Sequence, residues 1–220
     1  MDPLPPGPAS LRLRVVVAAW SLVLAGAMTA LAAYGAAPGE QRPAPRRWPA
    51  ALDAALAPPP GRLRLVLAAH PRCPCTRASL RELERLVSHR PGALEATVLF
   101  FQPEGAGSAW RETALWRLAE ELHHVTPVAD LEGGLAATVG ALTSGHAVVY
   151  DARGTLRFQG GLTGARGHEG DNAGTAAVRA LIGEAATAAA SAEALHGNPV
   201  FGCDLSDPER DTTRPAPRTP

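Results

Sequence analysis

The sequence predicts an α/β domain, with a mixed central sheet covered by helices on both faces, preceded by one N-terminal transmembrane helix. Three observations lead to this prediction. Helix-like and strand-like segments alternate through the middle of the chain, and a long uncharged segment lies near its start. Of the 21 prolines, eleven lie in residues 1–60 and four in the last 13 residues, as expected if the folded domain lies between them.

Composition excludes several classes of protein. The chain has 220 residues, enough for one domain and additional segments, and 46% of them are hydrophobic, which excludes a wholly disordered chain. Its 21 basic residues are all arginines, balanced by 21 acidic residues, so no nucleic-acid partner is expected. Three cysteines are too few for a disulfide scaffold, so any cysteine chemistry is local.

The N-terminal uncharged segment, residues 15–37, is long enough to cross a membrane as a helix, which needs about 20 apolar residues. Arg12 and Arg14 precede it in a short tail, residues 1–14. The alternative is a cleaved secretory signal, with small residues around position 34 as the cleavage site. Because the apolar core of such a signal typically has about 7 to 15 residues, we expect an uncleaved anchor.

Arginines on both sides of the anchor leave its orientation undecided, but long domains are translocated largely regardless of charge. We therefore expect a single-pass protein of the inner (plasma) membrane, with the folded domain facing the periplasm or exterior. Residues 38–61, rich in proline and alanine, are expected to be a linker, residues 62–205 the folded domain, and residues 206–220 a disordered tail.

Within the domain, apolar residues recur with the periods of strands and helices. The last helix follows Asp171 and Asn172, either of which can cap it. The expected elements, in order, are a strand at 62–69, a helix at 76–89, a strand at 94–101, a helix at 108–123, a strand at 125–129, a short helix at 133–141, strands at 147–151 and 155–160 that form a hairpin, and a helix at 173–194.

The candidate active site is a pair of cysteines, Cys73 and Cys75, separated by Pro74 and placed between the first strand and its helix. A helix N-terminus carries partial positive charge and free N–H groups, and both stabilise a thiolate. The pattern therefore predicts a nucleophilic cysteine at this position. Further positive charge is expected from three neighbours: His70, Arg72 and Arg77.

A Cys-Pro pair that opens the first helix, within this order of elements, resembles the thioredoxin fold. The chain is similar in particular to the membrane-anchored, extracytoplasmic thioredoxin-like proteins of bacteria, including a small group labelled RedB. The segment 148–154 (VVYDARG) is similar to the strand and turn that follow the active-site proline in such proteins. The resemblance implies thiol-disulfide exchange with protein thiols or disulfides outside the cytoplasm.

The resemblance also implies a role for each cysteine. In the family, the apolar positions of the first helix fall 7, 10 and 13 residues after the attacking cysteine, and Leu80, Leu83 and Leu86 fall at these distances from Cys73. Cys73 therefore matches the catalytic nucleophile. Cys75 lies one residue earlier than the family's resolving cysteine and is the expected resolving thiol. A disulfide across one intervening residue is strained and exchanges readily.

One departure from the family leaves an alternative open. The proline that faces the cysteines in the family is missing, and Gly145 stands near its place. Because that proline excludes metal in the family, its absence allows a Cu(I)-binding module for assembly of a respiratory or redox enzyme. Soft thiolates favour Cu(I), and His146, His168 or Cys203 would complete the site.

Two features have more than one interpretation. Cys203, the odd cysteine, is a small buried hydrophobe, a partner for Cys73 or Cys75, or a metal ligand. The glycine-rich loop 163–174 is expected to cap the last helix, with His168 as a candidate base or ligand. The sequence has no nucleotide-binding loop, zinc-protease motif or nucleophile elbow, so no cofactor is expected.

Overall fold

The structure is a computed structural model that describes residues 8–52, 56–57, 60–187 and 198–206. The chain divides into two compact units, Met1–Ala37 and Pro38–Pro220. The first unit contains one helix, α1 (Pro8–Ala36). Its segment Leu11–Ala36 has a mean hydropathy of 2.1 and is long and apolar enough to cross a membrane, a test that a signal sequence also passes.

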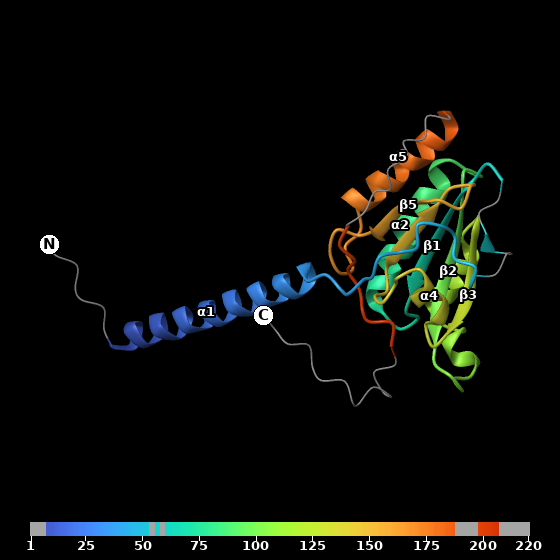
Figure 1. Cartoon of the computed structure of the whole chain (residues 1–220). Helices are drawn as coiled ribbons and strands as arrows, with labels where there is room; N and C mark the ends of the chain where they lie inside the picture. The colour runs from blue at the N-terminus through green and yellow to red at the C-terminus, as the bar shows by residue number, and fades with distance from the viewer. Residues whose placement is uncertain (1–7, 53–55, 58–59, 188–197, 207–220) are drawn as a thin grey trace. The chain divides into compact units, whose positions relative to one another are not determined.

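The second unit is built on a five-stranded sheet in the order β3-β2-β1-β4-β5 (Figure 1). β1 pairs in parallel with β2, which pairs in parallel with β3, whereas β4 is antiparallel to both β1 and β5. Every residue of β1 is buried, as expected for a central strand with both faces covered. The strands are β1 (Leu63–Ala69), β2 (Leu94–Gln102), β3 (Val125–Leu131), β4 (His146–Tyr150) and β5 (Leu156–Gly161).

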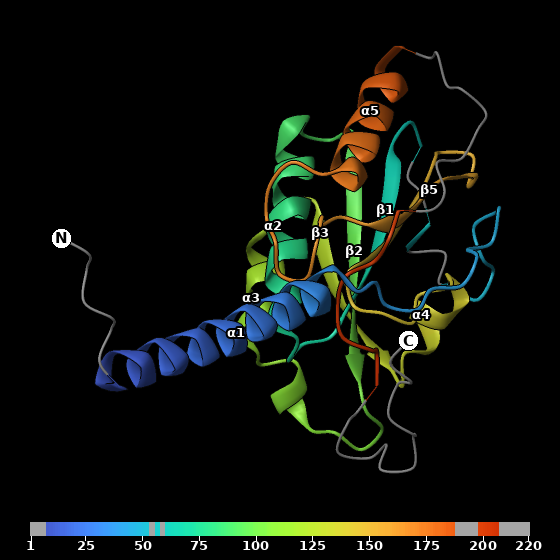
Figure 2. The same cartoon turned by 90° about the vertical axis from the view of Figure 1, so that its left-hand side faces the viewer.

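One face of the sheet packs against three helices, α2 (Pro74–His89), α3 (Ala114–Glu121) and α5 (Ala173–Thr187). Alternate residues of each strand point to opposite faces, so Leu65 and Leu67 of β1 lie in this helical core while Val66 and Ala68 face the other way. Figure 2 shows α2 on one side of the sheet and the short α4 (Gly134–Thr138) on the other. The thioredoxin-like fold predicted from the sequence is confirmed.

The face opposite α2 is covered by a segment that the sequence assigns to the linker. Its first part, residues 38–52, packs along the sheet and makes backbone hydrogen bonds from Arg42 N to Gly140 O (2.9 Å) and from Trp48 N to Gly154 O (2.8 Å). The Trp48 and Tyr150 rings meet edge to face at 5.2 Å. The short α4 leaves apolar side chains of β4 uncovered, and this segment buries them. The compact unit thus begins at Pro38.

Two helices differ from the sequence expectation in their bounds. The helix expected at 108–123 is a 3₁₀ turn, η2 (Ser108–Trp110), followed by α3, because the Thr113 hydroxyl accepts a hydrogen bond from Trp116 N (3.2 Å) and starts a new helix. Asn172 caps α5, since its side-chain oxygen accepts from Thr175 N (3.0 Å). The expected continuation of α5 over 188–194 and the tail from 207 lie outside the described residues.

Candidate active site

Cys73 is the N-cap residue of α2, and Pro74 is the first residue of the helix. Proline is favoured there because its fixed φ suits the helix and its missing N–H would have no partner inside the helix. The helix is held on the core by Leu80, Leu83 and Leu86, which are fully buried. The sequence therefore fixes the Cys73 sulfur at the positive end of a well-anchored helix.

Three segments that are distant in sequence meet at this point. Ser144, in the loop before β4, places its hydroxyl 2.8 Å from the hydroxyl of Thr76 in α2. The Ser144 hydroxyl also accepts a hydrogen bond from His70 N (3.0 Å). The Ser144 N–H donates to Cys203 O (2.8 Å), which joins the loop to the C-terminal segment, residues 198–206. Thr143 and Asp204 form an antiparallel bridge in the same place.

This arrangement brings Cys203 onto Cys73. Their sulfur atoms are 2.8 Å apart, although the residues are 130 positions apart in sequence. Cys73 is buried, with only 2% of its surface exposed, whereas Cys75 and Cys203 are half-buried. All three cysteines are free thiols. Of the three roles that the sequence left open for Cys203, the structure favours that of a partner for Cys73.

The pKa of Cys73 is lowered from 9.0 to about 5. The largest cause is the hydrogen bond from the Cys203 thiol, and the backbone N–H groups of Cys203, Cys75 and Thr76 act in the same direction, against the effect of burial. Burial and the charge on Cys73 raise the pKa of Cys75. The pKa of Cys203 is raised mainly because its thiol donates to Cys73. At neutral pH the negative charge of the site therefore lies on Cys73.

None of the basic residues that the sequence placed around Cys73 is a cause of its lowered pKa. The His70 ring stacks on Phe101, with ring centroids 5.7 Å apart, and its Nδ1 accepts from Arg72 N (3.2 Å). The Arg72 guanidinium lies over the Trp110 ring at 4.1 Å, and Arg77 is exposed. Hydrogen bonds, with that of Cys203 first, account for the low pKa of Cys73.

The glycine-rich loop contributes an arginine to the site. Arg166 donates a hydrogen bond to Gly202 O, and its charge partly offsets the rise in the pKa of both Cys75 and Cys203. His168, which the sequence singled out, is exposed. Only the concentration of polar residues in this loop could have indicated Arg166 beforehand.

His146 belongs to the opposite face of the sheet. Its Nε2 lies 3.3 Å from the Gln159 amide nitrogen, and the Gln159 oxygen accepts from Ala44 N (2.8 Å) in the segment that covers this face. Burial lowers the pKa of His146 to about 4, so the ring is neutral at physiological pH. Within the described part of the chain, no group of three or more His, Cys, Asp or Glu side chains is arranged to hold a metal ion.

Gly145 explains why the expected proline is absent. Its N–H donates to Ala68 O (2.8 Å), a hydrogen bond that proline cannot make, and its φ of 93° lies in the region that favours glycine. A Cβ at this position would also lie 3.0 Å from the Ser79 hydroxyl of α2. The loop before β4 thus packs directly on α2 through a residue without a side chain.

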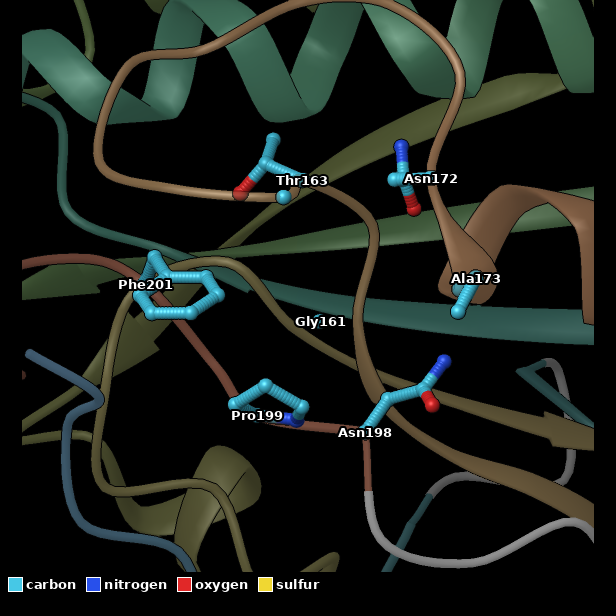
Figure 3. A pocket seen from close by; sticks show the side chains of 9 residues that line it. Gly161, Thr163, Asn172, Ala173, Asn198, Pro199 and Phe201 are labelled. Carbon is cyan, nitrogen blue, oxygen red and sulfur yellow. The ribbon is translucent and has the colours of Figure 1, made fainter. Parts of the chain in front are cut away.

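A shallow pocket lies beside the C-terminal segment and has a volume of about 180 Å³. Figure 3 shows the side chains of Thr163, Asn172, Asn198 and Phe201 around it. None of the cysteines lines this pocket. The pocket lies where residues 198–201 run beside the β5–α5 connection.

Comparison with known proteins supports the fold. No protein-family model matches the chain, and no curated protein matches it by sequence. An uncharacterised conserved protein from Geobacillus kaustophilus has a TM-score of 0.54 at 15% identity, covering 79% of this chain and 95% of its own. A hypothetical protein from Sinorhizobium meliloti has a TM-score of 0.52 at 19% identity, covering 78% and 91%. These likenesses show the fold alone.

Proposed function

We propose that the chain is a thiol-disulfide exchange protein in which Cys73 is the nucleophile. The observation that carries the proposal is the buried Cys73 sulfur at the start of α2, which lies 2.8 Å from the Cys203 sulfur. Only the thiolate attacks a disulfide, and this environment favours the thiolate. The thioredoxin-like fold supports the proposal, because it places the sulfur at the end of the sheet where β1 leads into α2.

The reaction has two steps. In the first, the Cys73 thiolate attacks one sulfur of a substrate disulfide, forms a mixed disulfide and releases the other sulfur as a thiolate. In the second, another thiol of the chain attacks the Cys73 sulfur and releases the substrate's remaining thiol. The sequence predicts Cys75 for this second role. Run in reverse, the same steps oxidise a substrate dithiol.

We further propose that the domain acts on protein thiols or disulfides outside the cytoplasm while α1 anchors it to the membrane. The apolar α1 and the extended segment after it support this arrangement. A reporter that functions only after export, fused after Pro220, is expected to be active, and the chain is expected to stay in the membrane fraction at its full size. Reporter activity confined to the cytoplasm would contradict the orientation.

The nucleophile can be tested by alkylation of the reduced full-length protein in detergent. In a Cys75→Ser variant, the tryptic peptide 73–77 contains a single thiol, so its modification by iodoacetamide reports Cys73 alone. Because the pKa of Cys73 is lowered to about 5, its alkylation rate should reach half its maximum near that pH. A midpoint near 9, the ordinary value for a thiol, would contradict the assignment.

Exchange itself can be measured with insulin as the disulfide substrate. Cys73→Ser is expected to abolish exchange, since no other thiol of the chain has a lowered pKa. A variant that keeps its activity would show that Cys73 is not the nucleophile. No observation in the described structure favours the Cu(I) alternative over this chemistry.

A further inference from the structure

We propose that Cys203 is the thiol that resolves the mixed disulfide on Cys73, so that the oxidised protein carries a Cys73–Cys203 disulfide. This inference rests on the proposed function and assigns its second thiol. It differs from the sequence prediction, which gave this role to Cys75. The proposal begins from the 2.8 Å between the sulfurs of Cys73 and Cys203. A shortening of about 0.8 Å brings them to the length of a disulfide bond.

Backbone hydrogen bonds position the C-terminal segment and so place Cys203 beside Cys73. Ser144 N donates to Cys203 O (2.8 Å), and Leu205 N donates to Leu142 O (2.9 Å), so the segment pairs antiparallel with the loop before β4. Gly202 passes so close to Ser144 that a Cβ there would overlap Ser144 O. The segment is therefore seated closely enough to define which residue faces α2.

Earlier residues of the segment are seated in the same way. A side chain on Gly160 would overlap Asn198, and one on Gly161 would overlap Pro199 O. Val200 is fully buried and its carbonyl accepts from Gly39 N (2.7 Å). The glycine pair that ends β5 thus lets the backbone of the segment that contains Cys203 pack directly against the end of this strand.

Burial of Cys73 is consistent with a resolving thiol that moves with its segment. Because only 2% of the Cys73 surface is exposed, a substrate disulfide reaches the sulfur only when the segment around Cys203 lifts away. Once the mixed disulfide has formed, return of the segment places the Cys203 sulfur on the Cys73 sulfur. Cys203 then forms the new S–S bond, and the substrate leaves with the electron pair of the broken bond.

The step balances without another reactant. Two electrons pass from the Cys73 thiolate and the Cys203 thiol to the substrate disulfide, which becomes one thiol and one thiolate, and the Cys203 proton goes to a departing substrate sulfur. The charge on Cys73 raises the pKa of Cys203 in the reduced protein, and formation of the mixed disulfide removes that charge. The positive charge of Arg166 remains and favours the Cys203 thiolate at that stage.

The disulfide can be mapped on the wild-type full-length chain in detergent. After oxidation with diamide and blocking of free thiols at acid pH, trypsin releases Cys203 in peptide 180–210 and the other two cysteines in peptide 73–77. We expect these two peptides to be linked, with the link kept in Cys75→Ser and lost in Cys73→Ser. A disulfide confined to peptide 73–77 would overturn the assignment.

Single-turnover exchange with insulin tests the resolving step. Cys203→Ser should accumulate one insulin mixed disulfide per chain, whereas Cys75→Ser, which tests the rival assignment, should not accumulate it. Accumulation only in Cys75→Ser would overturn the Cys203 assignment and leave the proposed function intact. A wild-type chain that forms the Cys73–Cys203 bond but exchanges nothing would contradict both the function and the resolving role.

Discussion

The two segments that meet at Cys73 are held in different ways. The first turn of α2 belongs to a 16-residue helix whose apolar face is buried in the core. The described C-terminal segment, residues 198–206, has no regular secondary structure and is held by single backbone hydrogen bonds and close glycine contacts. The nucleophile therefore sits on a rigid element, and its partner sits on a segment with fewer restraints. Such a pairing allows the partner to leave and return while the nucleophile stays in place.

Both segments contribute to the reactivity of Cys73, but unequally. The start of α2 supplies the backbone N–H groups of Cys75 and Thr76, but the larger contribution is the hydrogen bond from Cys203. The pKa of the nucleophile is thus set mainly by the less restrained segment. Changes to that segment should alter the chemistry of Cys73 without touching α2.

The largest effect is expected from Gly202→Ala. A Cβ at this position would overlap Ser144 O, so the segment must shift and Cys203 loses both of its hydrogen bonds to the Cys73 sulfur. A hydrogen bond to a charged group contributes about 1.5 to 3 kcal/mol, and one pKa unit corresponds to about 1.4 kcal/mol. The pKa of Cys73 should therefore rise by about two units or more, measured by iodoacetamide alkylation against pH.

Gly134→Ala is the matched control, because no atom lies within 4 Å of a Cβ built there and the residue lies in α4, away from the cysteines. It should leave the alkylation profile unchanged. If Gly202→Ala also leaves it unchanged and still forms the Cys73–Cys203 disulfide, the close seating of the segment is not what places Cys203.

A smaller effect is expected when only the side chain of Cys203 is changed. Cys203→Ala removes the thiol hydrogen bond but keeps the backbone one, so the pKa of Cys73 should rise by about one to two units. Cys203→Ser retains a hydrogen-bond donor and should keep most of the lowering. Neither variant can form the disulfide. Equal alkylation profiles for the wild type and Cys203→Ala would show that the first turn of α2 alone lowers the pKa.

The sequence predicts one of these two segments far better than the other. Cys73, Pro74 and the apolar residues of α2 are neighbours in sequence, so the helix start and its thiol follow from local pattern. The contact with Cys203 spans 130 residues and depends on Gly202 and Ser144, which carry no local signal of it. The positive charge expected near Cys73 from Arg72 is predicted from sequence distance alone. Packing on the Trp110 ring decides where its guanidinium lies.

The segment after α1, residues 38–52, is likewise predicted only in part by the sequence. Proline and alanine content predicts a linker after the anchor, and residues 38–49 form no helix. These residues cover a face of the sheet because α4 is short and because polar partners are available there. One of them is Gln159, whose side-chain oxygen accepts a hydrogen bond from Ala44 N. These are properties of the folded sheet, so composition alone could not indicate them.

The smallest effect is expected at Arg166, which joins the glycine-rich loop to the C-terminal segment by a hydrogen bond to Gly202 O. Its charge partly offsets the rise in the pKa of Cys75 and of Cys203. Interactions of partly exposed charges are worth about 0.2 to 1 kcal/mol, so Arg166→Gln should raise the pKa of Cys75 by less than about one unit. Arg166→Lys keeps the charge and should leave that pKa nearly unchanged.

The pKa of Cys75 is measured by iodoacetamide alkylation in a Cys73→Ser background, where peptide 73–77 again holds one thiol. If Arg166→Gln instead slows closure of the Cys73–Cys203 disulfide more than Gly202→Ala does, charge on the glycine-rich loop, and not the close fit at Gly202, controls the return of the segment.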